Sequence, residues 1–395
     1  MASNWAMAMD SGMGEHFRIE LGGGVTEIDA QQWDALVDAT PQTTVFQRHA
    51  WLAALQHHGC VQPQRGWQPL LLTLRDNDGA LAAACELYAK GHSFGEYVFD
   101  WAWADAHERC GVAYYPKLLL ATPFTPVRGA RLLGRDLAAR RALLDAVLGL
   151  ARRSGVSSLH LLFLADAERD LCAQAGLALR TTIQYHWSQP DGGWIDFDDF
   201  LRSLNHDKRK KIRQERSRLD AIVFRRLSGH TAGDADWALF ARCYRRTYAL
   251  HGSTPYLNLG FFRAVAAALP DHVLLLVASR DGVDIASSLV LLDPATGQAW
   301  GRYWGALEDV PNLHFEACYY QPIAYCIEHG YRVFEGGAQG RHKMARGLLP
   351  VSCTSAHWIA EPRLAEAIAR HLDGETQAMD DALDELAEHA PFRRD

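Results

Sequence analysis

Hydrophobic and polar positions follow one pattern that occurs twice along the chain. In the first half, an apolar helical stretch at 51–59 precedes the segment 69–90, where two apolar runs flank an Asp-Asn-Asp-Gly turn. In the second half, a helical stretch at 260–270 precedes 272–293, whose two runs flank an Asp-Gly turn. This spacing predicts a helix followed by an antiparallel hairpin in each half. We therefore expect two copies of one structural plan.

The pattern continues beyond each hairpin. A helix is expected at 104–110 in the first copy. The second copy predicts a strand at 299–306, a helix at 314–329 with Asn312 as its N-cap, and a further strand at 331–334. Strands that alternate with helices in this way indicate an α+β architecture of mixed sheets flanked by helices.

The boundary between the copies falls in a turn-rich stretch, Gln189-Pro190-Asp191-Gly192-Gly193. The sequence thus predicts four parts: a flexible N-terminus at 1–17, a first domain at 18–189, a second domain at 190–361 and a C-terminal amphipathic helix at 362–395. The second domain opens with a helix that is dense in basic residues.

The composition limits the classes of protein to consider. The 395 residues are 48% hydrophobic and 22% charged, which is typical of a globular protein of about two domains. A net charge of -7 argues against a general nucleic-acid binder, so any polyanion site must be a local patch. Eight cysteines without a C-x-x-C pair, no signal peptide and no apolar run of membrane-spanning length predict a cytoplasmic protein without a membrane span or metal.

The basic helix is the clearest local patch. Seven of the eleven residues from Lys208 to Arg218 are Lys or Arg. Ile212 and Leu219 form a narrow apolar stripe that can dock the helix while its other faces stay cationic. The density favours a polyanion site for tRNA, a nucleotide pyrophosphate or anionic lipid head groups, with a solvated face as the alternative. The predicted phosphate contacts are Lys208, Arg209, Lys211 and Arg213.

A second cluster follows the strand at 331–334. Glu335 is followed by two glycines, and Gln339, His342 and Lys343 come within eight residues. The spacing matches neither a Walker phosphate loop nor a G-x-G-x-x-G turn. An acid, an amide and an imidazole at one strand end are the groups that a general base and an oxyanion clamp require. The alternative is a tight turn with a solvated charged face.

The segment before this cluster supplies further candidates. Arg302 and Trp304 are expected on one face of their strand, as substrate contacts. His314 and Glu316 open the following helix, as a substrate contact and a further candidate base. A negative side chain also suits a helix N-terminus, which is the alternative explanation for Glu316.

The first half has its own candidates for substrate binding. Glu96, Asp100 and Trp101 lie in an acidic and aromatic stretch where alternation predicts a strand. Carboxyl groups among aromatic rings tend to have raised pKa values. Lys117 and Arg128 lie between prolines, which suggests a loop that holds a carboxylate or phosphate, or else a solvated loop.

Several segments resemble one known family. GEYVFDWAWADAHERCGVAYYPKLL, PFTPVRGARLL, GRYWG, LHFEACYYQ and GAQGRHKMARGLLP are similar to signature segments of the bacterial FemAB-like group of N-acyltransferases and peptidoglycan biosynthesis proteins. The resemblance spans 51–358 and implies tandem GNAT-like domains that transfer an acyl or aminoacyl group to an amine. Fem-type enzymes take that group from aminoacyl-tRNA. The glycine turn with which GNAT enzymes grip acyl-CoA is absent from 307–316.

The first hypothesis, an aminoacyl- or acyl-transferase, gives the candidates the following roles. Glu335 or His342, and next Glu316, would take the proton of the amine, while Gln339 and the backbone N–H groups at 336–337 would stabilise the oxyanion. Lys117 and Arg128 would hold the acceptor, a small-molecule or peptide amine. Two alternatives stay open: an acyl-CoA-dependent N-acyltransferase, and a GNAT-shaped RNA- or nucleotide-binding protein without catalysis. No cofactor is expected apart from the acyl donor.

Overall fold

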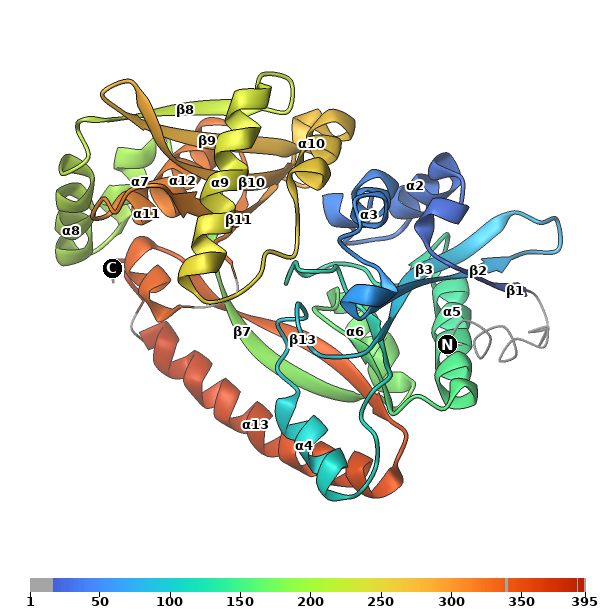
Figure 1. Cartoon of the computed structure of the whole chain (residues 1–395). Helices are drawn as coiled ribbons and strands as arrows, with labels where there is room; N and C mark the ends of the chain where they lie inside the picture. Colours follow the sequence, from blue (N-terminus) through green and yellow to red (C-terminus); the bar gives the residue numbers. More distant parts are fainter. Residues whose placement is uncertain (1–16, 338–339, 389, 394–395) are drawn as a thin grey trace. The chain divides into compact units, whose positions relative to one another are not determined.

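The computed structural model describes residues 17–337, 340–388 and 390–393, and it divides into two compact units (Figure 1). Unit 1 comprises Met1–Thr182 and Cys353–Asp380, and unit 2 comprises Ile183–Ser352 and Asp381–Asp395. Gln339 and nearly all of the N-terminal stretch predicted to be flexible lie outside the described residues.

Unit 1 is built on a mixed sheet in the order β1-β2-β3-β4-β6-β13. Every neighbouring pair is antiparallel except β4 and β6, which are parallel. The strands are β1 (Arg18–Gly22), β2 (Trp67–Arg75), β3 (Leu81–Lys90), β4 (Lys117–Leu120), β6 (Ser158–Leu161) and β13 (Leu349–Ile359), with the short β5 (Leu133–Gly134) paired to β3. The helices are α2 (Ala30–Ala39), α3 (His49–His57), α4 (Trp101–Arg109), α5 (Leu137–Ser154), α6 (Asp166–Gln174) and the start of α13 (Pro362–Glu388).

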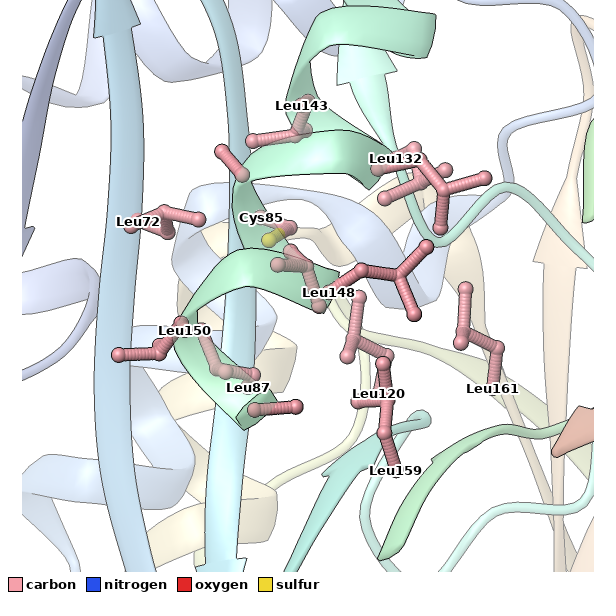
Figure 2. Close-up of a cluster of buried hydrophobic side chains, with 14 of the residues drawn as sticks. Leu72, Cys85, Leu87, Leu120, Leu132, Leu143, Leu148, Leu150, Leu159 and Leu161 are labelled. Atoms are coloured by element: carbon pink, nitrogen blue, oxygen red, sulfur yellow. The ribbon is translucent and has the colours of Figure 1, made fainter. Parts of the chain in front are cut away.

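The core of unit 1 lies between its sheet and α5. The helix begins where the Asp136 carboxylate accepts a hydrogen bond from the N–H of Ala139, and it ends at Gly155, whose φ of 68° suits glycine. Its apolar face covers one side of β3, where Cys85 and Leu87 lie in the leucine-rich cluster of Figure 2.

Unit 2 repeats this plan with its sheet in the order β7-β12-β11-β10-β9-β8. Its one parallel pair among the described strands is β11 with β12. The strands are β7 (Ala178–Ser188), β8 (Ile222–Ser228), β9 (Val273–Arg280), β10 (Val283–Asp293), β11 (Gln298–Ala306) and β12 (Val333–Glu335). The helices are α7 (Phe197–Ser203), α8 (His206–Ser217), α9 (Asp234–Leu250), α10 (Leu259–Ala268), α11 (Leu313–Phe315) and α12 (Gln321–Glu328), with a π turn at Glu316–Tyr320.

The two units confirm the predicted repeat. In each, two helices precede an antiparallel hairpin, a third antiparallel strand follows, and a helix leads to a parallel neighbour. The turn between β9 and β10 has positive φ at both Asp281 (51°) and Gly282 (77°), which is the geometry of a two-residue type I′ hairpin. The predicted fold class, α+β with two repeated domains of mixed sheets flanked by helices, is therefore confirmed.

The sheet of each unit is completed by a strand from the other half of the sequence. β13 follows unit 2 along the chain, yet its residues Ala356–Ile359 pair with β6 in unit 1. β7 follows the first repeat, yet its residues His186–Ser188 pair with β12 in unit 2. The predicted domain ranges, 18–189 and 190–361, contain no such exchange, because alternation identifies a strand but not its partner.

Three local predictions differ from the structure. The strand predicted through Asp100 and Trp101 is wrong, because α4 begins at Trp101 and Asp100 is its N-cap residue. Lys117 is the first residue of β4 rather than part of a loop. Asn312 does precede the next helix, but it has a φ of 69° and its side chain makes no capping hydrogen bond.

Candidate functional site

Glu335, the last residue of β12, lies directly opposite His186 of the antiparallel strand β7. Residues opposite each other in an antiparallel pair project to the same face of the sheet. Accordingly, the Glu335 Oε1 atom lies 3.8 Å from His186 Nε2, which is 3.3 Å from the Gln184 side-chain oxygen. All three side chains are buried, so an acid and an imidazole are held together at a strand end.

The two glycines after Glu335 allow other groups to approach the backbone closely. A Cβ atom at Gly336 would lie 3.1 Å from Tyr319 Cε1 and 2.6 Å from Leu348 Cδ2, which is too close. Gly337 has a φ of 88°, a conformation that favours glycine, and its carbonyl accepts a hydrogen bond of 2.6 Å from Lys343 Nζ.

Lys343 brings a cation to this turn from the 3₁₀ helix Arg341–Arg346. Its side chain is buried, and burial lowers the pKa of Lys343 to about 8, with the charge of Arg302 acting in the same direction. Arg302 is the extra residue of a β-bulge in β11, because Leu289 pairs with Tyr303 while Val290 pairs with Gly301. The bulge and the 3₁₀ helix thus bring two cationic side chains close to the turn.

His342 and His314 both contact Tyr319. The Tyr319 hydroxyl lies 3.2 Å from His342 Nε2, and the rings of His314 and Tyr319 are 5.6 Å apart. Burial, together with Arg346 and Lys343, lowers the pKa of His342 below its ordinary value. Burial also lowers the pKa of His314 to about 4, and His314 packs against the Trp304 ring at 5.1 Å. His314 is therefore neutral at pH 7.

Glu316 points in a different direction, toward α8. Its carboxylate accepts two hydrogen bonds of 3.1 Å from Arg216 and one of 2.8 Å from Gln321. This pairing gives Glu316 a structural role in fastening α8 to the π turn. Among the candidate bases, Glu335 and His342 thus lie at the glycine turn, whereas Glu316 does not.

A second contact holds α8 in place, because a buried ion pair links it to the 3₁₀ helix. Arg346 donates to both oxygens of Glu215 at 3.1 Å, and its guanidinium lies 3.5 Å from the centre of the Phe315 ring. The Tyr320 hydroxyl donates to the same carboxylate. These contacts fix the 3₁₀ helix that carries His342 and Lys343.

The basic helix α8 begins at Asn205, whose side-chain oxygen accepts a hydrogen bond from the N–H of Lys208. Ile212 is buried, as predicted, and the cations line two open grooves. One groove, of about 720 Å³, is lined by Arg202, His206, Arg209, Lys210, Arg213, Gln214 and Ser217. The other, of about 680 Å³, is lined by Asp207, Lys210, Lys211, Gln214, Glu215, Arg218, Asn312 and Phe315. Phe315 also contacts the His342 ring at 6.2 Å, so the second groove adjoins the glycine turn.

Three predicted residues of unit 1, Glu96, Asp100 and Lys117, belong to a buried network of charges. Lys117 Nζ donates to Glu96 and to Ser93 at 2.8 Å each and also contacts Asp100. Lys117 is fully buried, and Lys90 lies 3.7 Å from Glu96. This network holds the loop between β3 and α4. As substrate contacts, Glu96, Asp100 and Lys117 stay predictions.

The pKa values in this network follow its charges. Burial lowers the pKa of Lys117, but Glu96 and Asp100 outweigh burial and leave it above its ordinary value. Burial raises the pKa of Asp100, but Lys117 outweighs burial and leaves it below its ordinary value. For Glu96 burial prevails, and its pKa is raised.

The two remaining candidates of unit 1 lie apart from this network. Arg128 pairs with Asp166 at 2.5 Å. The Trp101 side chain is 41% exposed and contacts the ring of Phe94 at 5.2 Å. The expectation that Lys117 and Arg128 share one loop is wrong, because Lys117 lies inside the sheet.

Sequence reasoning missed two residues of the site. His186 was not among the candidates, although Gln184 and His186 are polar at alternate positions of an otherwise apolar strand end. Glu215 is an acid within a run of cations, which is the pattern of a buried partner rather than of a uniform phosphate-binding face. Both signals are present in the sequence but do not identify the partner residues.

Within the described parts of the chain, no helix combines the length and the apolar character needed to cross a lipid bilayer. The same residues contain no group of three or more His, Cys, Asp or Glu side chains that could hold a metal ion.

Solved structures share the fold of this chain at low sequence identity. The C-terminal domain (DUF2156) of a putative lysylphosphatidylglycerol synthetase from Agrobacterium fabrum is 12% identical, with a TM-score of 0.53 over 87% of this chain and 96% of that one. The L-PGS from Bacillus licheniformis is 11% identical, with a TM-score of 0.51 and the same coverages. A tandem GNAT protein from the clavulanic acid biosynthesis pathway is 14% identical, with a TM-score of 0.42 over 87% and 99%.

No curated protein sequence matches the chain. The model of the FemAB-like family, described as peptidoglycan biosynthesis/recognition, matches residues 24–394, which is nearly the whole sequence. The chain belongs to the FemAB-like family and is an acyltransferase.

Proposed function

We propose that this protein forms an amide by transferring an aminoacyl group from aminoacyl-tRNA to a primary amine. The observation that carries the proposal is the arrangement at the end of β12, where the Glu335–His186 pair and the Lys343 ammonium group flank a glycine turn. An acid, an imidazole and a cation around a glycine turn are the groups that amide formation from an activated ester requires.

In the proposed reaction, Glu335 accepts the proton that the amine loses as it attacks the acyl carbon. The ester bond to the tRNA ribose then breaks, and the ribose oxygen takes up that proton and leaves as a hydroxyl group. His186 stabilises the carboxylate and fixes its orientation across the strand pair. His342 is the second candidate base, because the causes that lower its pKa also keep its imidazole neutral and able to accept a proton. Glu316 ranks below both, because Arg216 already binds both of its oxygens.

The negative charge that develops on the acyl oxygen is proposed to meet Lys343 and the N–H of Gly337. The N–H of Gly336 is less suited, because it points to the carbonyl of Tyr185 at 3.5 Å. Gln339 stays a predicted oxyanion contact outside the described residues. Donors that are already in place when charge develops typically contribute a factor of about 10²–10³ in rate.

The cations of α8 are proposed to hold the phosphates of the donor. Lys211 and Arg213 are exposed, Lys208 and Arg209 are half-buried, and the groove lined by Lys211 adjoins the glycine turn through Phe315. One solved structure of similar fold is the C-terminal domain of a putative lysylphosphatidylglycerol synthetase, a name that includes an aminoacyl group. A donor made of tRNA fits an extended basic surface better than a single pyrophosphate does.

The acceptor is proposed to be a small-molecule or peptide amine that lies against Arg302, Trp304 and His314. The description of the family makes a peptidoglycan precursor the first choice. In unit 1, Trp101 and Arg128 are the predicted contacts that a substrate can reach, since Lys117 is fully buried. A cytoplasmic location belongs to the same proposal, because charged tRNA is made in the cytoplasm.

The test measures two quantities with bulk aminoacylated tRNA: its binding across a salt series, and the transfer of labelled amino acid to an amine. Glu335→Gln should lower the transfer rate by about 10²–10⁴-fold with little change in tRNA binding. Glu308→Gln is the matched control, because Glu308 is an exposed acid of the same unit that pairs with Arg280.

Three results would redirect the proposal. If tRNA binds no better than a non-specific polyanion, at about 10⁻⁴–10⁻⁶ M in physiological salt, the donor assignment is wrong. If acetyl-CoA or a longer acyl-CoA competes and supports transfer, the protein is an acyl-CoA-dependent N-acyltransferase. If Glu335→Gln and His342→Gln both leave cellular function intact while changes in α8 abolish it, the protein binds RNA without catalysis.

A further inference from the structure

Helix α9 covers one face of the sheet of unit 2 (Figure 1). The Tyr244 ring of α9 contacts the Tyr303 ring of β11 at 5.3 Å, and a Cβ atom at Gly305 would overlap a backbone oxygen of α9. Trp304, between these two strand residues, contacts His314, which lies just before the π turn. Because successive side chains of a strand point to opposite faces, α9 lies on the face opposite to the π turn and the α8 helix that is fastened to it.

The outward side of α9 carries arginine without a neutralising acid. Arg242, Arg245 and Arg246 are exposed, and within the described residues no carboxylate pairs with any of the three. Both acids of the helix lie in its first turn and pair with arginines of other elements, at 2.8 and 2.9 Å. The sequence from 237 to 270 contains neither Asp nor Glu, although 47 of the 395 residues are acidic. This side of unit 2 is therefore a local basic surface on an acidic protein.

The three arginines are placed at a cost to the helix. Arg245 and Arg246 follow Arg242 by three and four residues, and like charges at these spacings repel each other and destabilise a helix. The helix dipole favours cations only within the last turn, and the last turn of α9 contains no basic residue. Cations that are held together against their repulsion, without an internal partner, indicate an anionic partner outside the chain.

The apolar neighbours of these arginines indicate what kind of anion they meet. Leu250 is 73% exposed and follows Arg246 by four residues, so it lies on the same side of the helix. Exposed alanines, Ala238 and Ala249, flank the arginines on this side. An RNA backbone offers phosphates but no apolar contact for a leucine. A lipid surface offers phosphates beside acyl chains, so it uses both kinds of side chain.

We propose that the outward side of α9 binds the surface of an anionic membrane. The guanidinium groups of Arg242, Arg245 and Arg246 would bind head-group phosphates, and Leu250 would enter the edge of the acyl-chain region. Three cations and one apolar side chain give reversible binding to the surface. The proposed tRNA contacts on α8 lie on the opposite face of the sheet, so lipid and tRNA would bind without competing. The inference does not depend on the proposed function.

The test is sedimentation of the whole protein with lipid vesicles. Vesicles of phosphatidylcholine with about 30% phosphatidylglycerol should bind the protein, whereas vesicles of phosphatidylcholine alone should not. Added salt should weaken the binding, because it screens charges at the surface. Replacing Arg242, Arg245 and Arg246 together by glutamine should lower the affinity for the anionic vesicles by about 30–150-fold. Leu250→Ser should lower it by about 3–30-fold.

The control replaces four cations of α8 by glutamine, at Lys208, Arg209, Lys211 and Arg213, and so removes more charge than the α9 variant does. It should keep vesicle binding and weaken tRNA binding, whereas the α9 variant should do the reverse. The α9 variant should melt no lower than the unmodified protein, because its helix loses a repulsion between like charges.

The outcomes separate this proposal from the proposed function. The membrane proposal is wrong if vesicles with phosphatidylglycerol bind no better than those without it, or if the α8 and α9 variants lose vesicle binding equally. It is also wrong if the α9 variant loses tRNA binding and keeps vesicle binding, because the surface would then bind RNA. If tRNA does not bind the unmodified protein while anionic vesicles do, only the proposed donor is wrong.

Discussion

Replacing Lys117 by methionine should destabilise unit 1 strongly and in a pH-dependent way. Lys117 is fully buried and makes two hydrogen bonds of 2.8 Å, to Glu96 and Ser93, besides its contact with Asp100. Methionine has a similar volume, so packing changes little and the loss is chiefly electrostatic. The change leaves two buried carboxylates with only Lys90, at 3.7 Å from Glu96, as a nearby cation.

The expected loss in the free energy of unfolding follows from the interactions that Lys117 makes. Losing the charge-assisted hydrogen bonds costs about 1.5–3 kcal/mol each. Relaxation of the site recovers part of that loss. Removing one partner of a buried ion pair typically costs about 3–5 kcal/mol in total. For a unit of this size, the Tm should fall by about 6–20 °C. Arg169→Met, which removes an exposed cation beside Asp170, is the control and should have almost no effect.

The pH dependence tests the cause. Without Lys117, burial raises the folded-state pKa values of Glu96 and Asp100 above their unfolded values, so the folded variant binds more protons. Its stability should therefore fall as pH rises from about 5 to 8, and the deficit should be smallest at low pH. Urea melts at several pH values measure this directly. A deficit below about 1 kcal/mol, or one that does not change with pH, would refute the reasoning.

Three further predictions concern unit 2. Because burial lowers the pKa of Lys343 to about 8, the transfer rate should fall as pH rises through 8. Lys343→Arg should shift this fall to higher pH. A rate that still falls at pH 8 in the variant would contradict the assignment. Gly336→Ala should cost about 1–3 kcal/mol and displace Tyr319, measured by urea melts with Gly374→Ala as an open-space control. The four cations of α8 to replace by glutamine are Lys208, Arg209, Lys211 and Arg213. Their replacement should lower the slope of log affinity for tRNA against log salt concentration by about 3. The control, Arg152→Gln with Arg153→Gln in α5, should leave that slope unchanged.

The sequence was sufficient for the repeated plan because the signal is local. Each hairpin shows two apolar runs around a turn whose residues tolerate positive φ, and both were found where predicted. The strand at 299–306 and the helix that follows it were found for the same reason. The π turn at Glu316–Tyr320 was not foreseen, because helical periodicity continues through it.

The site was predicted less completely because its contacts are long-range. Glu335, His342 and Lys343 are close in sequence, and the structure places them around one glycine turn. His186 lies about 150 residues before Glu335, and only the pairing of β7 with β12 brings the two together. Lys117 was assigned to a loop because prolines flank its segment, whereas burial between two carboxylates decides its place.

The exchange of end strands between the two repeats constrains how the protein is made. As the chain leaves the ribosome, the first repeat emerges with β6 still lacking its antiparallel neighbour, since residues 356–359 are translated nearly two hundred residues later. Until then β6 offers an open edge, which favours aggregation. Because the two repeats trade strands in this way, the chain cannot be divided into two independent proteins, so both repeats are inherited together even if only one carries the chemistry.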